Sequence, residues 1–401
     1  MHALAIERDS GDAAGSTAAN LRDSDRTSPW PARHAAPVSS AADPLAEGAV
    51  EAVPRGEGSP MADGHGDLLA AVEALAERGD EPCRAFLAHA LEHPSWVDTA
   101  RLEEGQRLGL ALAVPTGAVL LLGGLVEVYG VAPIADALGS TRRLHDQTWR
   151  RILETGRLVR DVHLRGAMAP GADGLRAIVR VRLLHAMIRV RLAHRGHDVI
   201  TQEQMAFTLC AHSHVVRRCL SRLGIRLTAR EARAHQHLWR LIGHAMGVRP
   251  EFLPDSPEQE TRLYRRLRLE LCTGAAGAGR VLTARTIETV ARRSRLPRAL
   301  VSTLVHHLVG AQLADRLAVR RTTSYAALLS VGSALLGGAN RMRRASSRLD
   351  ALCMRGGRGF ANVVLETDPG RGDPIAAAAA RGALAMLSDA RRRGLDPCTA
   401  R

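Results

Sequence analysis

Apolar residues recur at helical spacing from about Asp67 onward. Leu68, Val72 and Leu75 follow one another at intervals of four and three residues, which brings their side chains to one face of an α-helix. Before this point, residues 1–64 are rich in Ala, Ser, Asp, Gly and Pro and have no sustained period. Because such a segment buries little apolar surface, we predict that residues 1–64 form a disordered N-terminal extension.

Several of the predicted helices begin with a capping signal. In a capping box, a Ser or Thr side chain accepts a hydrogen bond from the amide three residues on, and a Glu or Gln at that position returns one. Three starts of this kind are Thr201 with Gln204, Thr228 with Glu231, and Ser256 with Pro257 and Gln259. No run of alternating residues bounded by hairpin turns interrupts the helical pattern. We therefore predict an all-α fold.

The helical pattern predicts a single large multi-helix domain over residues 65–366. A C-terminal tail over residues 367–401 follows the Gly/Asp/Pro stretch Asp368–Pro374 and contains one further candidate helix, Ile375–Leu387. No repeat of fixed period divides the domain.

The longest uncharged run extends from Leu108 to Val126. Its length would reach across a bilayer, but it contains Pro115, Thr116 and several glycines. We interpret this run as a buried helix pair in a soluble core, with a membrane-embedded segment as the alternative.

Composition agrees with packed helices and bears on the partners. Hydrophobic residues make up 46% of the chain and aromatic residues 3%, so Leu, Val and Ala fill the core. The formal net charge of +14 is compatible with nucleic acid or an acidic membrane surface. All 55 basic residues are arginines scattered along the chain, a usage typical of a GC-rich genome. We therefore expect no nucleic-acid partner and retain association with a membrane surface as an alternative.

Cysteine usage and the N-terminus indicate the compartment. The six cysteines form no C-x-x-C pair, and their spacing fits neither a zinc site nor a disulfide framework. Dispersed thiols are typical of a reducing compartment. Residues 1–12 contain acids and lack the apolar segment of a signal peptide. These features predict a cytoplasmic protein and leave the oligomeric state open.

The candidate chemistry lies on the helix predicted from Leu175 to Arg195. His185 follows Arg182 by three residues and precedes Arg189 by four, so the three side chains share one helical face. A buried guanidinium keeps its proton and needs an anionic partner, yet this helix contains no acid. Haem would supply two propionates for the arginines and an iron for a neutral imidazole. The alternative is a core or surface histidine of no special role.

Two further sets of residues are candidates for the site. Arg151 and Thr155 are four residues apart and could face one pocket, although a helical Thr often bonds to its own backbone. The remaining histidines considered as metal ligands have unsuitable spacing, and we interpret them as core or surface residues: His212, His214, His235, His237, His244, His306 and His307.

Four segments in a fixed order resemble the latex-clearing protein (rubber oxygenase) and MpaB oxygenase family. They are Arg151–Val162, Val179–Leu192, Ile200–Leu209 and Leu223–Val248. Within them, the short pattern R-x-x-H-A-x-x-R precedes W-R-x-I-G, which begins at Trp239. The resemblance covers roughly residues 100 to 265 and depends on this order.

The resemblance implies an all-α haem-binding domain with a globin-like core and one haem b. It implies that His185 is the axial ligand of the haem iron and that Arg182 and Arg189 support the haem. It also implies that Arg151 and Thr155 lie on the distal side, where dioxygen would bind. In rubber-cleaving members this site splits a carbon–carbon double bond, so an apolar isoprenoid-like small molecule or polymer is the expected substrate.

The sequence departs from the rubber-cleaving pattern in ways that leave alternatives open. Glu154 stands where those members have Lys, and Glu127 and Asp136 are both candidates for their acidic base. A hydrophobic channel lined by Leu108–Val126 is expected. A haem-binding protein without turnover is a second hypothesis. The third is a DNA-binding helix-turn-helix over Thr283–Val309, for which ordinary bundle packing is the alternative.

Overall fold

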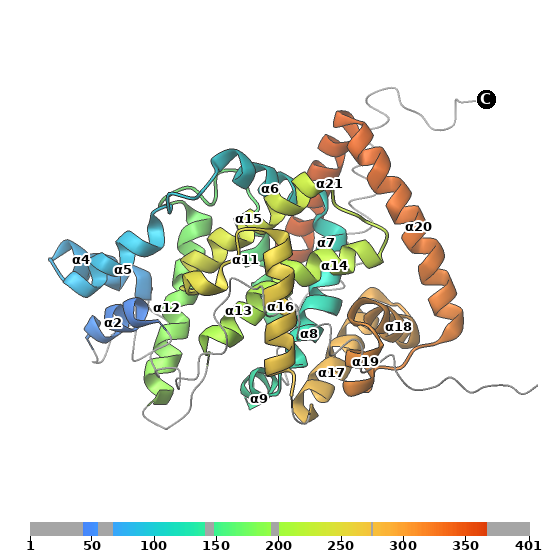
Figure 1. The fold of residues 1–401 in the computed structure, drawn as a ribbon, viewed down its shortest axis with the longest axis horizontal. Helices are drawn as coiled ribbons and strands as arrows, with labels where there is room; N and C mark the ends of the chain where they lie inside the picture. The colour runs from blue at the N-terminus through green and yellow to red at the C-terminus, as the bar shows by residue number, and fades with distance from the viewer. Residues whose placement is uncertain (1–42, 55–66, 141–147, 194–199, 274–275, 367–401) are drawn as a thin grey trace, which may run out of the picture. The chain divides into compact units, whose positions relative to one another are not determined.

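The computed structural model describes residues 43–54, 67–140, 148–193, 200–273 and 276–366. Within these ranges the chain forms helices and no strand (Figure 1), which confirms the predicted all-α fold. The first helices are α2 (Pro44–Ala52), α4 (Leu68–Glu77), α5 (Glu81–Leu91), α6 (Thr99–Ala111), α7 (Ala113–Val119), the π-helix η2 (Leu120–Gly124), α8 (Leu125–Tyr129) and α9 (Ala132–Ser140).

The second half of the chain continues the pattern with longer helices. The central helices are α11 (Thr148–Val162), α12 (Asp173–Ala193), α13 (Gln202–His212), α14 (His214–Arg222) and α15 (Ala229–Ala245). The last are the 3-10 helix η3 (Pro250–Phe252), α16 (Pro257–Leu271), α17 (Gly277–Ser294), α18 (Arg298–Val309), α19 (Ala311–Arg316), α20 (Thr323–Ala345) and α21 (Ser347–Glu366).

The predicted helix starts are confirmed at α13, α15 and α16. The boxes that begin at Thr201 and Thr228 have both of their hydrogen bonds. At α16, Ser256 accepts from the amide of Gln259 at 3.2 Å, but the Gln259 side chain accepts from the amide of Asp255, one residue before the cap. Local capping chemistry therefore fixes these three helix starts.

The prediction of disorder over residues 1–64 is wrong for residues 43–54. Asp43 caps α2 by accepting from the amide of Ala46 at 3.3 Å, and Pro44 occupies the first turn. Ala46, Ala49 and Val50 are fully buried against α5 and α12. A short helix with a small apolar face gains its stability from tertiary packing, and this packing is absent from the local sequence pattern. The other residues of the predicted extension, and Ile375–Leu387, lie outside the described ranges.

The apolar run Leu108–Val126, predicted as a buried helix pair, is a bent helical segment in which Val114, Gly117 and Ala118 are exposed. Leu108, Leu122 and Val126 pack in the largest apolar cluster, together with α13, α14 and α18. In the described part of the chain, no single helix is long and apolar enough to cross a membrane. The pair formed by Thr99–Ala111 and Ala113–Tyr129 reaches that length and composition together but is bent by 82°.

The candidate helix-turn-helix is part of the helical bundle. Helix α18 packs against α14, α17 and α20, and Val301, Val305 and Leu308 on it are buried. A recognition helix must leave a face free for the major groove. These contacts favour the bundle alternative over DNA binding. The five described cysteines are free thiols, in agreement with the sequence: Cys83, Cys210, Cys219, Cys272 and Cys353.

Candidate functional site

Helix α12 carries His185 between Arg182 and Arg189 and packs against α2, α5 and α15. The sequence predicts that this face of α12 is buried, and both arginines are buried. Arg182 forms a two-pronged ion pair with Asp43, with Nε to Oδ2 at 2.7 Å and Nη2 to Oδ1 at 2.9 Å. Its guanidinium also lies over the ring of Phe86, 5.1 Å from the ring centre.

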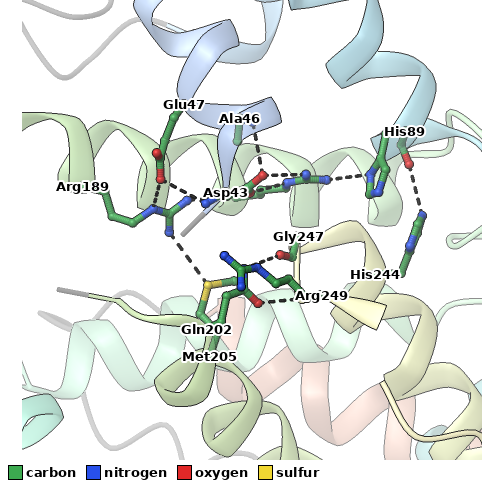
Figure 2. Close-up of polar contacts among 11 residues, drawn as sticks. Asp43, Ala46, Glu47, His89, Arg189, Gln202, Met205, His244, Gly247 and Arg249 are labelled. Carbon is green, nitrogen blue, oxygen red and sulfur yellow. Dashed lines mark hydrogen bonds and ion pairs between the residues drawn. The ribbon is translucent and has the colours of Figure 1, made fainter. Parts of the chain in front are cut away.

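Arg189 binds α2, the short helix that Asp43 caps. Its Nε donates to Glu47 Oε1 at 2.6 Å, and its Nη2 lies 3.7 Å from Asp43 Oδ2. On the other side, Nη1 contacts the sulfur of Met205 at 3.9 Å. Figure 2 shows Asp43 and Glu47 of α2 facing Arg189, with Gln202 and Met205 below them.

These contacts correct the argument that the two arginines need an external anion. Asp43 and Glu47 supply the negative charge, from a segment 139 and 142 residues away along the chain. We call the set Asp43, Glu47, Arg182 and Arg189 the Asp43 cluster. Since each guanidinium has a carboxylate partner inside the protein, haem propionates are not required to balance the two charges.

His185 is held neutral in this setting. Burial, and after it the charge of Arg189, lowers the pKa of its imidazole to about 4, while Asp43 opposes the shift. Its Nδ1 atom is buried, and no described residue gives it a hydrogen bond. A neutral imidazole with an unused nitrogen suits a metal ligand, so the donor fits an iron.

A pair of stacked histidines extends the cluster towards α15. Arg182 Nη1 donates to His89 Nδ1 at 3.1 Å, so that nitrogen carries no proton. The rings of His89 and His244 stack with their centres 4.4 Å apart, and His244 Nε2 donates to the carbonyl of His89 at 3.2 Å. Burial is the largest cause that lowers the pKa of His244 to about 4. Two neutral rings therefore lie beside the buried ion pair (Figure 2).

Gly247 is a close backbone contact of the Asp43 cluster. It has φ +79°, and an added Cβ would lie 2.3 Å from Asp43 Oδ2 and 2.6 Å from Arg182 Nε. Gln202 fixes this turn by donating to the Gly247 carbonyl and accepting from the Arg249 amide, both at 2.9 Å. Only glycine allows the chain to pass so near the ion pair with this backbone conformation.

The two candidates for the acidic base have different surroundings. Asp136 is exposed on α9. Glu127 is fully buried on α8, where it accepts from Arg218 Nη2 at 2.7 Å and from the Tyr264 hydroxyl, and lies 3.3 Å from Arg268 Nε. We call Glu127, Arg218, Tyr264 and Arg268 the Glu127 cluster. All of its carboxylate oxygens are in use, so it has the character of a structural ion pair.

The predicted distal residues lie on α11, which packs against α12. Thr155 and Glu154 are exposed. Arg151 belongs to the helix, and its side chain lies outside the described part of the structure. The distal roles of Arg151 and Thr155 stay predictions.

The other histidines lie in or against the core. Among the described residues no group of three His, Cys, Asp or Glu side chains could hold a metal ion. His163, His212 and His235 surround Trp239, with ring centres 5.1 to 6.3 Å from the indole. Burial lowers the pKa of each of these three imidazoles. His163 and His235 also have a buried Nε2 without a described hydrogen-bond partner, but neither lies between paired arginines on α12.

Sequence reasoning missed the partners of the arginines. Asp43 with Pro44 and an acidic first turn is a recognisable helix start, and this signal could have revealed α2. Gly247, directly after a predicted helix, carries the signal of a glycine C-cap. No signal in the sequence indicates that these two features meet Arg182.

The protein is thus an all-α domain in which a neutral, half-buried histidine lies between ion-paired arginines. Residues 113–338, more than half of the chain, match the family described as ER-bound oxygenase mpaB/B′/rubber oxygenase, catalytic domain. The chain belongs to this family, which confirms the resemblance seen in its four segments.

Two relatives agree with this assignment. The rubber oxygenase of Streptomyces sp. (strain K30) is 24% identical over 263 residues, which are 63% of this chain and 64% of that protein. This chain therefore aligns with less than two thirds of its relative. The solved structure of latex clearing protein LCP in the closed state has the same fold, with a TM-score of 0.61 and 20% identity over 79% of this chain and 88% of that one.

Proposed function

We propose that this protein is a haem b-dependent oxygenase that cleaves a carbon–carbon double bond in an apolar, isoprenoid-like substrate, with dioxygen as co-substrate. The observation that carries the proposal is the buried His185 Nδ1 without a described partner, inside the range that matches the oxygenase family. The relative named rubber oxygenase favours a hydrophobic small molecule or polymer as substrate.

His185 is the residue that would hold the iron, and haem would supply the centre that activates dioxygen. The Asp43 cluster would position the side chains around His185. Two carboxylates keep Arg182 and Arg189 in place on either side of the imidazole, and the nearby guanidinium disfavours its protonated form. Arg151 and Thr155 are proposed for the distal side, where they would orient dioxygen or the substrate.

An absorption spectrum of purified, hemin-reconstituted protein tests the cofactor. We expect a Soret band that His185→Ala removes, with circular dichroism unchanged. The matched control is His93→Ala: His93 lies outside the Asp43 cluster and contacts the carbonyl of Met168 at 2.6 Å. A protein that stays colourless after incubation with hemin would contradict the proposal, and so would a His185→Ala variant with the wild-type spectrum.

A haem-binding protein without turnover is the second candidate. The observation that favours it is the Glu127 cluster, in which the candidate base is saturated by Arg218, Tyr264 and Arg268, while Asp136 is exposed. Oxygen consumption with a panel of alkenes and polyisoprene separates the two candidates. A haem-loaded protein that consumes no oxygen with any of them would support binding alone.

A further inference from the structure

Helix α20 has its apolar residues on the outside. Its buried residues are Gly337, Asn340 and Arg343, whereas four large apolar side chains are 56% to 71% exposed: Leu328, Val331, Leu335 and Met342. The intervals between these four are three, four and seven residues, which brings them to one helical face. Exposed apolar patches of this kind on a folded domain mark interaction surfaces.

Polar contacts, and not apolar packing, attach the inner side of α20. Arg343 donates to Glu231 Oε1 at 2.6 Å and to Asp350 Oδ1 at 2.5 Å, and Asn340 donates to the carbonyl of Arg226 at 3.3 Å. Gly337 allows close contact, because a Cβ there would lie 2.9 Å from the carbonyl oxygen of Gly224. Figure 1 shows α18 and α21 on the same side of α20. The apolar face is thus not needed to hold the helix to the domain.

Arginines frame the apolar face at both ends. Residues 322–340 contain no charged side chain, and no acid occurs between Asp315 and Asp350. The exposed arginines are Arg320 and Arg321 before the helix, and Arg341 and Arg348 at its other end. Arg344 beside them pairs with Glu231 at 3.6 Å. An apolar stripe with cationic ends is complementary to a surface that is apolar in its interior and anionic at its rim.

We propose that the apolar face of α20 docks the protein on an anionic lipid bilayer. The helix would lie in the plane of the membrane, with its apolar side chains among the acyl chains and the flanking arginines at the headgroups. Long arginine side chains reach such headgroups while their stems contact apolar surface. The inference is independent of the haem proposal.

Charge argues against a second copy of α20 as the occupant. Two copies paired along this face, parallel or antiparallel, bring arginines next to arginines. No acid on the helix compensates for that repulsion. An anionic bilayer removes the repulsion, and the binding gains from each arginine near the surface.

Flotation of the full-length protein with vesicles tests the inference. We expect binding to vesicles of phosphatidylcholine with phosphatidylglycerol, and little binding to phosphatidylcholine alone. The double variant Val331→Ser/Leu335→Ser should weaken binding about tenfold or more, since two apolar side chains leave the acyl region. Leu269→Ser is the matched control, because Leu269 on α16 is 66% exposed and lies outside the patch.

A charge variant separates the electrostatic attraction to the headgroups from the apolar contact with the acyl chains. Arg320→Gln/Arg321→Gln should weaken binding about fivefold per arginine at low salt, whereas Arg292→Gln on α17 should have no effect. Thermal unfolding of every variant verifies the fold, and none of these side chains is buried. Failure of the wild-type protein to bind anionic vesicles would overturn the inference. So would unchanged binding by the serine variant, or a wild-type dimer that this variant converts to monomer.

Discussion

The Asp43 cluster and the Glu127 cluster are both buried sets of acids and arginines, but they differ in what they surround. In the Glu127 cluster, Arg218, Tyr264 and Arg268 saturate one carboxylate. In the Asp43 cluster, two carboxylates pair with Arg182 and Arg189 on either side of His185, whose Nδ1 has no described partner.

The difference separates a structural ion pair from a site. The Glu127 carboxylate has no oxygen left for a ligand, and breaking a buried ion pair costs stability. A buried imidazole nitrogen that its neighbours leave unused is costly unless it binds something. We therefore expect changes in the Glu127 cluster to affect stability alone, and changes in the Asp43 cluster to affect both stability and hemin affinity.

The largest expected effect is that of Glu127→Ala. It leaves the partly buried Arg218 without its carboxylate, so the free energy of unfolding in urea should fall by about 3–5 kcal/mol. The fraction that stays folded should bind hemin with the affinity of the wild type. The variant Glu127→Gln retains the hydrogen-bonding shape, so its free energy of unfolding should lie between those of the wild type and Glu127→Ala. A loss below about 1 kcal/mol would mean that water reaches the cluster.

Asp43→Ala tests the Asp43 cluster in the same way. Removing the carboxylate leaves Arg182 without its two-pronged partner, and we expect a loss of about 3 kcal/mol together with weaker hemin binding. The control is Glu104→Ala: Glu104 accepts a hydrogen bond from Arg230 at 2.8 Å, and this arginine is mostly exposed, so losing the pair should change stability little. Wild-type hemin affinity in folded Asp43→Ala protein would show that the Asp43 cluster is also purely structural.

Gly247→Ala probes the backbone against the Asp43 cluster. The added methyl group would approach Asp43 Oδ2 to 2.3 Å at a backbone φ of +79°, and we expect a loss of about 1–3 kcal/mol. Gly166→Ala is the matched control, because Gly166 has φ +74° and its Cβ would meet nothing within 4 Å. Equal losses of stability in the two variants would mean that backbone strain alone, and not the contact with Asp43, causes the effect.

The remaining expected effect concerns pH and the Glu127 cluster. The ring of His214 lies 4.5 Å from that of Tyr264, and burial, then Arg217, Arg218 and Arg265, lower its pKa to about 3. An unfolded histidine takes up its proton near pH 6.5. On acidification the unfolded state therefore binds the proton first, and stability present above pH 6.5 is lost between pH 6.5 and about 3.

The variant His214→Asn should flatten this dependence. Its free energy of unfolding should fall less steeply with acidification than that of the wild type, by up to about 1.4 kcal/mol per pH unit for one proton. Urea unfolding at pH 7, 6, 5 and 4 measures both slopes. Parallel slopes would mean that His214 takes up its proton equally in the folded and unfolded states.

The helices and the shared face of Arg182, His185 and Arg189 on α12 can be predicted from the amino-acid sequence. Periodicity predicts α12 within two residues of its observed ends, and the capping residues Thr201, Thr228 and Ser256 fix three helix starts. Both signals are local, because hydrogen bonds and side-chain spacing within a few residues decide them. The family followed from the order of motifs for the same reason.

The partners in the buried ion pairs are evident from the tertiary structure and not from the sequence. Asp43 lies 139 residues from Arg182, and Glu127 lies 91 residues from Arg218, separations over which no local period carries information. The same holds for the exposed face of α20: its apolar spacing in the sequence is that of a core helix. Which side a helix buries depends on the polar anchors that other segments offer to Asn340 and Arg343.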